Sequence, residues 1–141
     1  RMKPNQWYDI LNTNAGSAFL VTHFAVDRMI KQEEPKGGSM VFVSSVGVMG
    51  LPGQANYAAS KSAMEAVAKV TAREYAKRNL YVSIIRPGFV ETDLTSGLSD
   101  KQKQSLIEMS TAKRPFKPDE IARGIAYLAT LKESGHIMTV F

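Results

Sequence analysis

Cysteine is absent from the sequence, and histidine is scarce, with only His23 and His136. The lack of cysteine excludes disulfide scaffolds, zinc–thiolate sites and cysteine nucleophiles. The two histidines lie too far apart for a metal-ligand spacing, so no metal site is predicted. No apolar run approaches the roughly 20 residues of a membrane span, and no basic-then-apolar leader opens the sequence. We therefore expect no membrane partner and a cytoplasmic location, or an organelle matrix or stroma if a targeting segment has been removed.

The remaining composition is that of a globular protein, with 44% hydrophobic and 22% charged residues, too apolar for a disordered chain. The length of 141 residues suggests one domain at most, since domains average about 150 residues. A net charge of +5 is compatible with an acidic partner or a phosphorylated ligand. Because the sequence has no RNA- or DNA-binding motif, no nucleic-acid partner is expected.

Apolar periodicity and capping signals predict alternating helices and strands. Helices are expected over residues 5–30, 54–78, 99–106 and from Pro118 onward. Strands are expected over residues 40–43, 81–85 and 136–141. Asn79 is expected to end the second helix as a C-cap, and Ser99 to cap the third.

This alternation predicts an α/β fold with a doubly wound, Rossmann-like parallel sheet. The first two strands read as buried on both faces, and a sheet of only three strands would leave apolar edges exposed. We therefore expect the chain to be an incomplete C-terminal portion of a larger domain, or to need a partner. On the helix 54–78, the residues expected to line one apolar face are Ala59, Ala63, Val67 and Val70.

The most specific chemical pattern is Ser44 followed, after twelve residues, by Tyr57-Ala-Ala-Ser-Lys61. On a helix, Tyr57 and Lys61 are four residues apart and share a face. A tyrosine hydroxyl is ordinarily a poor acid at neutral pH, and an adjacent ammonium lowers its pKa by favouring the phenolate. Ser44, at the end of a strand, could hydrogen-bond a substrate carbonyl at the edge where parallel sheets bind ligands.

These residues resemble the short-chain dehydrogenase/reductase family across essentially the whole chain. Trp7-x-x-x-Leu11-x-x-Asn14 is similar to the helix that carries the family's catalytic asparagine. Ser44, Tyr57 and Lys61 match its serine, tyrosine and lysine, and residues 87–92 match its Pro-Gly motif. Within the family, residues 53–57 and 87–93 look most like reductases of 3-oxoacyl groups bound to acyl carrier protein.

The resemblance implies reduction of a 3-oxoacyl thioester with NADPH, or with NADH, in fatty-acid synthesis. It implies that Tyr57 protonates the substrate oxygen, Ser44 holds that oxygen, and Lys61 binds the nicotinamide ribose. Asn14 would position a water that relays protons to Lys61. The residues expected to contact the cofactor are Tyr57, Lys61, Pro87, Gly88, Val90 and Thr92. Residues 94–114 are expected to form a lid over the substrate.

The family's Gly-x-x-x-Gly-x-Gly motif and its ribose selector are missing from the sequence. Residues 1–141 are therefore expected to form the catalytic and oligomerising part of one domain, without its dinucleotide-phosphate-binding part and inactive alone. Two alternatives stay open. One is a family member that acts on an acyl-CoA, a sugar or a steroid, and the other is a non-catalytic interaction module.

Basic residues gather at the end of the helix 54–78. They could form a solvated face, with Glu65–Lys69 and Glu74–Arg78 as i, i+4 pairs. Alternatively, Arg78 together with Lys36 could dock an acidic acyl carrier protein beside the mouth of the active site. The family resemblance also implies a homo-oligomer, a tetramer built on the helices 5–30 and 54–78 and completed by the last helix and strand.

Overall fold

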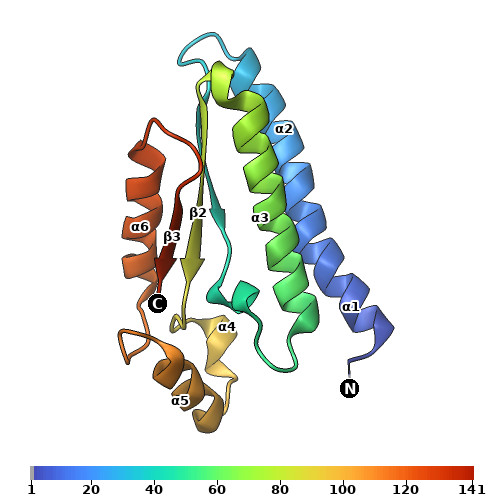
Figure 1. The fold of residues 1–141 in the computed structure, drawn as a ribbon, viewed down its shortest axis with the longest axis vertical. Coiled ribbons are helices and arrows are strands. Elements are labelled where there is room, and N and C mark those ends of the chain that lie inside the picture. Colours follow the sequence, from blue (N-terminus) through green and yellow to red (C-terminus); the bar gives the residue numbers. More distant parts are fainter. Residues whose placement is uncertain (1) are drawn as a thin grey trace.

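The computed structural model describes residues 2–141, which begin with one long helical rod (Figure 1). The α-helices α1 (Pro4–Leu11) and α2 (Ser17–Lys31) are joined without a break by a π-helical turn at Asn12–Gly16. This confirms the predicted helix over 5–30. The π turn was not predicted, because it follows from one extra residue per turn and not from the apolar period.

Three parallel strands form the sheet, in the order β1-β2-β3. The strands are β1 (Gly38–Val43), β2 (Leu80–Pro87) and β3 (Ile137–Val140). The register places Phe42 opposite Ile84, and Ile84 opposite Ile137. The parallel α/β fold is therefore confirmed, with β1 beginning two residues earlier than predicted and β2 continuing through Pro87.

Helices cover both faces of this sheet (Figure 1). The rod and α3 (Ala55–Tyr75) lie on one face, and α6 (Pro118–Thr130) lies on the other. α3 passes into a 3-10 turn at Ala76–Arg78 and ends at Asn79, whose φ of 56° is the left-handed conformation expected of a C-cap. The short helices α4 (Asp93–Ser96) and α5 (Asp100–Met109) lie below the carboxyl ends of the strands.

Each face of the sheet has its own apolar core. Val82 and Ile84 of β2 pack with Phe42, Met64 and Ala68 on the α3 side. Because side chains alternate along a strand, Ile85 points the other way, and it packs with Phe116, Ile121 and Leu128 on the α6 side. β2 is consequently buried on both faces, as predicted.

The predicted burial of β1 on both faces was wrong. Among residues 2–141, β1 is an edge strand, and only Phe42 of its six residues is buried. A hollow of about 450 Å³ lies along this edge, lined by apolar side chains of α2 and β1 such as Val21, Met29 and Val41.

The buried face of α3 also differs from the prediction. Ala59, Ala63 and Val67 are only half-buried, and Val70 is exposed. The residues of α3 that are buried are Ser60, Met64, Glu65, Ala68, Thr71 and Ala72. Half of these are polar, so an apolar period could not identify this face.

The rod carries a large apolar surface that no other part of residues 2–141 covers. Phe19, Leu20, Val21 and Phe24 of α2 are each more than half exposed, Phe24 at 68%. Within residues 2–141, no helix combines the length and apolarity that a membrane crossing requires.

Candidate active site

The predicted catalytic residues converge where β1 and β2 end, beside the start of α3. Tyr57 stands in the first turn of α3 and faces a cavity of about 330 Å³. The cavity is lined by Ser45, Val46, Leu51, Gln54, Tyr57, Gly88, Phe89, Val90, Thr95, Leu98 and Leu106. The carboxyl edge of a parallel sheet is where α/β proteins bind their ligands.

Gly47 makes room for the Tyr57 ring. It lies in the 3-10 turn Val46–Met49 that follows β1, and a Cβ atom built there would be 2.9 Å from Cε1 of Tyr57. A side chain at position 47 would therefore push the ring out of place. The sequence indicated only that this loop was rich in glycine, because the contact depends on how the loop folds over α3.

Lys61 lies one helical turn after Tyr57 and on the same side, as its spacing predicted. Its Nζ donates a hydrogen bond to the carbonyl oxygen of Val43 at 3.0 Å and lies 5.8 Å from the centre of the Tyr57 ring. Burial lowers the pKa of the Lys61 ammonium. The bond to Val43 ties α3 to the end of β1, which fixes the ammonium next to the tyrosine.

Ser44 stands at the expected place in the chain, but its hydroxyl is turned away from the cavity. The residue is only 4% exposed, and its Oγ donates a hydrogen bond to Oε1 of Glu65 at 2.8 Å. The serine that lines the cavity is its neighbour Ser45, whose Oγ accepts a hydrogen bond from the Gly47 N–H. The structure thus brings Tyr57 and Lys61 together, while the Ser44 side chain joins a different group.

That group is centred on Glu65, which sequence reasoning had placed on a solvated face. Glu65 is 3% exposed and is held by Arg86 of β2, from Nε to Oε1 at 2.7 Å and from Nη2 to Oε2 at 2.6 Å. The Arg86 hydrogen bonds are the main cause that lowers the Glu65 pKa, opposed by its burial. Nζ of Lys69 lies 3.7 Å from Oε2 of Glu65. The predicted i, i+4 pair is therefore present, as a weaker contact than the two Arg86 hydrogen bonds.

Asn14 links the rod to the helix that carries Tyr57 and Lys61. It lies in the π-helical turn, and its Nδ2 donates to Ser60 Oγ at 3.0 Å. Ser60 Oγ in turn donates to the carbonyl oxygen of Tyr57 at 2.8 Å. π turns often occur at functional sites, and this one presents Asn14 to the catalytic end of α3.

The predicted cofactor segment runs along the same edge. Gly88 and Val90 line the Tyr57 cavity, and Thr92 lines an adjoining hollow of about 360 Å³. The Gly88 N–H donates to the Val140 carbonyl at 2.7 Å, which anchors the segment to β3. A Cβ atom at Gly88 would approach that oxygen to 3.0 Å, so this position favours glycine.

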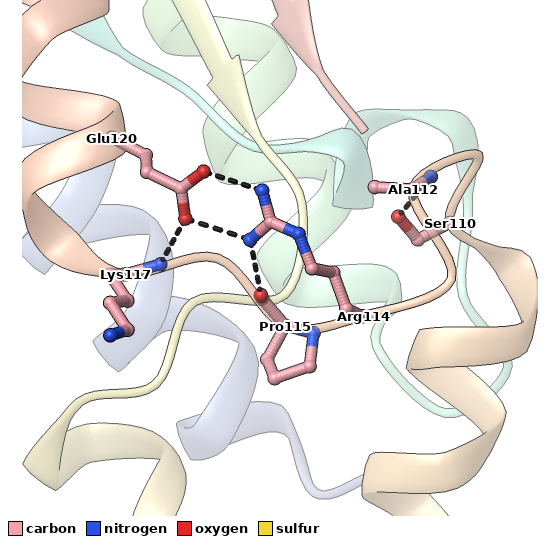
Figure 2. A network of polar contacts seen from close by, with 6 residues as sticks. All are labelled: Ser110, Ala112, Arg114, Pro115, Lys117 and Glu120. Atoms are coloured by element: carbon pink, nitrogen blue, oxygen red, sulfur yellow. Dashed lines mark hydrogen bonds and ion pairs between the residues drawn. The ribbon is translucent and has the colours of Figure 1, made fainter.

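The expected lid contributes to the cavity through Thr95, Leu98 and Leu106. Its C-terminal end is fastened to α6, as Figure 2 shows. Arg114 donates two hydrogen bonds to the Glu120 carboxylate, at 2.8 and 2.6 Å, and Glu120 also accepts from the Lys117 N–H at 2.9 Å. These contacts lower the pKa of Glu120 to about 2. The lid therefore has one fixed end.

Lys36 and Arg78 lie in adjacent loops, but not beside the cavity of their own chain. Both are exposed, and Gly38, two residues after Lys36, donates to the carbonyl of Asn79, the residue after Arg78, at 2.9 Å. These loops are at the amino ends of the strands (Figure 1). Residues 58–75 of α3, about 27 Å of helix, separate them from Tyr57. Within one copy of the chain, Lys36 and Arg78 therefore do not line the Tyr57 cavity. Among the described residues there is also no Glu74–Arg78 ion pair.

Within residues 2–141, no three His, Asp or Glu side chains are grouped so as to hold a metal ion.

Comparison with known proteins gives similar sequences over nearly the whole chain. Residues 1–140 match the profile of a family described as enoyl-(acyl carrier protein) reductase. The chain is 42% identical over 135 residues to the 3-oxoacyl-(acyl-carrier-protein) reductase FabG of Thermotoga maritima, covering 95% of this chain and 54% of that protein. Identity to the Escherichia coli K12 protein of the same name is 40% over 130 residues, covering 92% and 52%. For Staphylococcus epidermidis RP62A it is 37% over 132 residues, covering 94% and 53%. The chain spans about half the length of the curated relatives it matches.

Proposed function

The chain belongs to the short-chain dehydrogenase/reductase family, and on that premise we propose that it supplies the catalytic part of an NADPH-dependent reductase. The proposed substrate is a 3-oxoacyl thioester on acyl carrier protein, reduced to the 3-hydroxyacyl form during fatty-acid synthesis. The relatives named for this reaction support the substrate.

The observation that carries the proposal is the placement of Tyr57 and Lys61. The tyrosine faces a cavity at the carboxyl edge of the sheet, and the lysine ammonium is held 5.8 Å from its ring by the Val43 carbonyl. Proton transfer from a positioned side chain contributes about 10²–10⁴-fold to a rate. A fixed phenol beside a fixed cation is suited to that task.

In the proposed mechanism, Tyr57 donates its proton to the substrate oxygen as negative charge develops there. Ser44 donates a hydrogen bond to the same oxygen, after its hydroxyl turns from Glu65. Lys61 would hold the cofactor ribose, and its ammonium favours the phenolate that Tyr57 leaves behind. Asn14, bonded to Ser60 beside Lys61, would hold a water that replaces the proton Lys61 passes on to the Tyr57 phenolate. When bound, the reduced nicotinamide supplies the hydride that adds to the 3-keto carbon.

Gly88, Val90 and Thr92 would hold the nicotinamide end of NADPH, with Pro87 setting the direction of the segment after β2. Residues 1–141 would thus be the catalytic and oligomerising part of one domain, and we expect no turnover from them alone. The dinucleotide phosphates need groups that this sequence does not offer, because the family's glycine-rich motif is missing from it.

We further propose that α2 and α3 pack against the same helices of a second copy, within a homotetramer. The exposed apolar residues of α2 support this assembly. A twofold axis across α3 would run the two copies antiparallel. The Arg78 end of one copy would then lie near the Tyr57 end of the other, where Lys36 and Arg78 could dock the acidic carrier protein.

The substrate assignment is tested with the full-length protein and a panel of ketones. Turnover of 3-oxoacyl thioesters on carrier protein and on coenzyme A, of a ketosteroid and of a keto sugar is measured with NADPH and with NADH. The proposal expects the highest kcat/KM for the carrier-bound thioester with NADPH. A preference for the steroid or the sugar would leave the proposed ketone reduction standing and show that the proposed substrate is wrong.

A further inference from the structure

The Ser44 hydroxyl already has an acceptor, and that acceptor is a carboxylate. Oγ of Ser44 lies 2.8 Å from Oε1 of Glu65. An ionised carboxylate only accepts hydrogen bonds, so the proton in this bond belongs to the serine. A serine hydroxyl has one proton, and it cannot be donated to Glu65 and to a substrate oxygen at the same time.

Glu65 is built to remain in place as an ionised acceptor. Arg86 donates two hydrogen bonds to it, at 2.7 and 2.6 Å, and Lys69 lies 3.7 Å away. The carboxylate is nearly fully buried, so its position is set by β2 and α3 together. Its lowered pKa is consistent with the charged form. The Tyr57–Lys61–Val43 contacts do not involve Glu65, so this group is separate from the proton donor.

We propose that Glu65, held by Arg86, is a positioning residue that keeps the Ser44 hydroxyl turned away from the cavity until the substrate oxygen becomes negatively charged. This inference rests on the proposed reductase function. A neutral ketone oxygen is a weaker acceptor than a carboxylate, since bonds to charged acceptors are about twice as strong. A developing alkoxide carries the charge that lets it compete for the proton. Ser44 would then stabilise the transition state more than the bound ketone.

An interaction made mainly in the transition state raises kcat, whereas one made equally with substrate lowers KM. The Glu65–Arg86 pair would therefore decide which of the two parameters Ser44 affects. Without the pair, the freed hydroxyl would also bind the ketone before reaction.

The test measures the effect of Ser44→Ala in two backgrounds of the full-length protein. One is native, and in the other Glu65→Leu with Arg86→Met replaces the pair by apolar side chains of similar size. In the native background, Ser44→Ala should lower kcat by about 100-fold and leave KM nearly unchanged. In the second background, Ser44→Ala should raise KM as well. Dissociation constants of the keto thioester, measured with oxidised cofactor, should follow KM.

The conservative variant Glu65→Gln guards against a double variant that fails to fold. Glu65→Gln keeps the shape of the side chain and offers a neutral acceptor. In this background Ser44→Ala should also raise KM, but by less than in the double variant. Glu74→Gln, an exposed glutamate on the same helix, is the matched control and should leave the effect unchanged.

If Ser44→Ala has the same effects on kcat and on KM in every background, the inference is overturned. The Glu65–Arg86 pair would then only stabilise the structure. If Ser44→Ala changes neither parameter while Tyr57→Phe abolishes turnover, the inference fails and the reductase function stands. A protein that reduces none of the ketones overturns both.

Discussion

At the scale of the residue, the candidate active site depends on a few side chains that their neighbours hold in one position. The Tyr57 ring lies against Gly47, the Lys61 ammonium reaches the Val43 carbonyl, and the Ser44 hydroxyl is bonded to Glu65. Each contact joins α3 to the end of β1. The chemistry proposed for the site needs these groups fixed to within a fraction of an ångström.

Gly47→Ala should lower kcat by about 10- to 100-fold, because misplacement of a reacting group by about 1 Å can cost 100-fold. The added Cβ would lie 2.9 Å from the Tyr57 ring and push it from its position. Steady-state kinetics of the full-length protein measure the effect. Gly97→Ala is the matched control, since a Cβ there has nothing within 4 Å and its φ is −74°. Equal activity of the two variants would show that Gly47 does not position the ring.

Sequence reasoning could place Tyr57 and Lys61 on one face of a helix, because residues four apart on a helix are neighbours, and it could place Ser44 at the end of a strand. It could not predict the direction of the Ser44 hydroxyl. That direction is set by Glu65 of α3, a buried carboxylate that Arg86 of β2 holds in place. A glutamate four residues before a lysine is ordinarily a surface pair. The role of Gly47 could not be predicted either, because it depends on a contact with the Tyr57 ring of α3.

At the scale of the element, most helices and strands could be predicted, with ends shifted by a few residues. Apolar runs and caps such as Ser99 and Asn79 act locally, and local signals are readable in a sequence. The π turn at Asn12–Gly16 and the polar buried face of α3 depend on packing between elements. The burial of β1 was overestimated because a continuous apolar run does not say whether both neighbouring strands are present.

The Glu65–Arg86 pair joins α3 to β2 and should make stability depend on pH. The folded pKa of Glu65 is lowered, so its contribution is complete above the unfolded value of about 4.3 and is lost as pH falls through the folded value. Thermal unfolding between about pH 6 and pH 2 should show a smaller loss for Glu65→Leu with Arg86→Met than for the native protein. Glu120 is a second carboxylate whose pKa is lowered. The same measurement on Glu120→Gln separates its contribution to stability from that of Glu65. Parallel curves for native protein and double variant would contradict the account.

At the scale of the whole molecule, two features are exposed in a single copy of the chain. One is the exposed apolar surface of α2, and the other is the basic pair Lys36 and Arg78 at the end remote from Tyr57. Antiparallel packing of α2 and α3 in a dimer would explain both. It would cover the apolar surface and bring the basic pair to the partner's active site.

Phe24→Asp should weaken self-association, because Phe24 is the most exposed of the large apolar residues of α2 and a charge resists burial in an interface. Light scattering at micromolar concentration should give a tetramer for the native protein and smaller species for the variant. Met109→Asp, an exposed apolar residue of α5, should leave the tetramer intact. A native monomer would contradict the assembly.

Arg78→Glu should raise KM for the carrier-bound substrate several-fold, more at low ionic strength, because exposed charges act on association and are screened by salt. Turnover of a carrier-free thioester should stay nearly the same. Arg123→Glu, an exposed arginine on α6, makes the same change of charge on the opposite face and should have little effect. Equal losses of kcat/KM on both substrates would show that Arg78 has a structural role. No loss on either substrate would show that Arg78 is only part of a solvated face.

The central claim is that Tyr57 is the proton donor of a ketone reductase, and Tyr57→Phe in the full-length protein tests it most directly. The substitution removes one hydroxyl and keeps the ring against Gly47. Turnover of a 3-oxoacyl thioester and the dissociation constant of NADPH are measured together. Turnover should be abolished while the affinity for NADPH stays nearly unchanged. A variant that retains most of its activity would contradict the central claim.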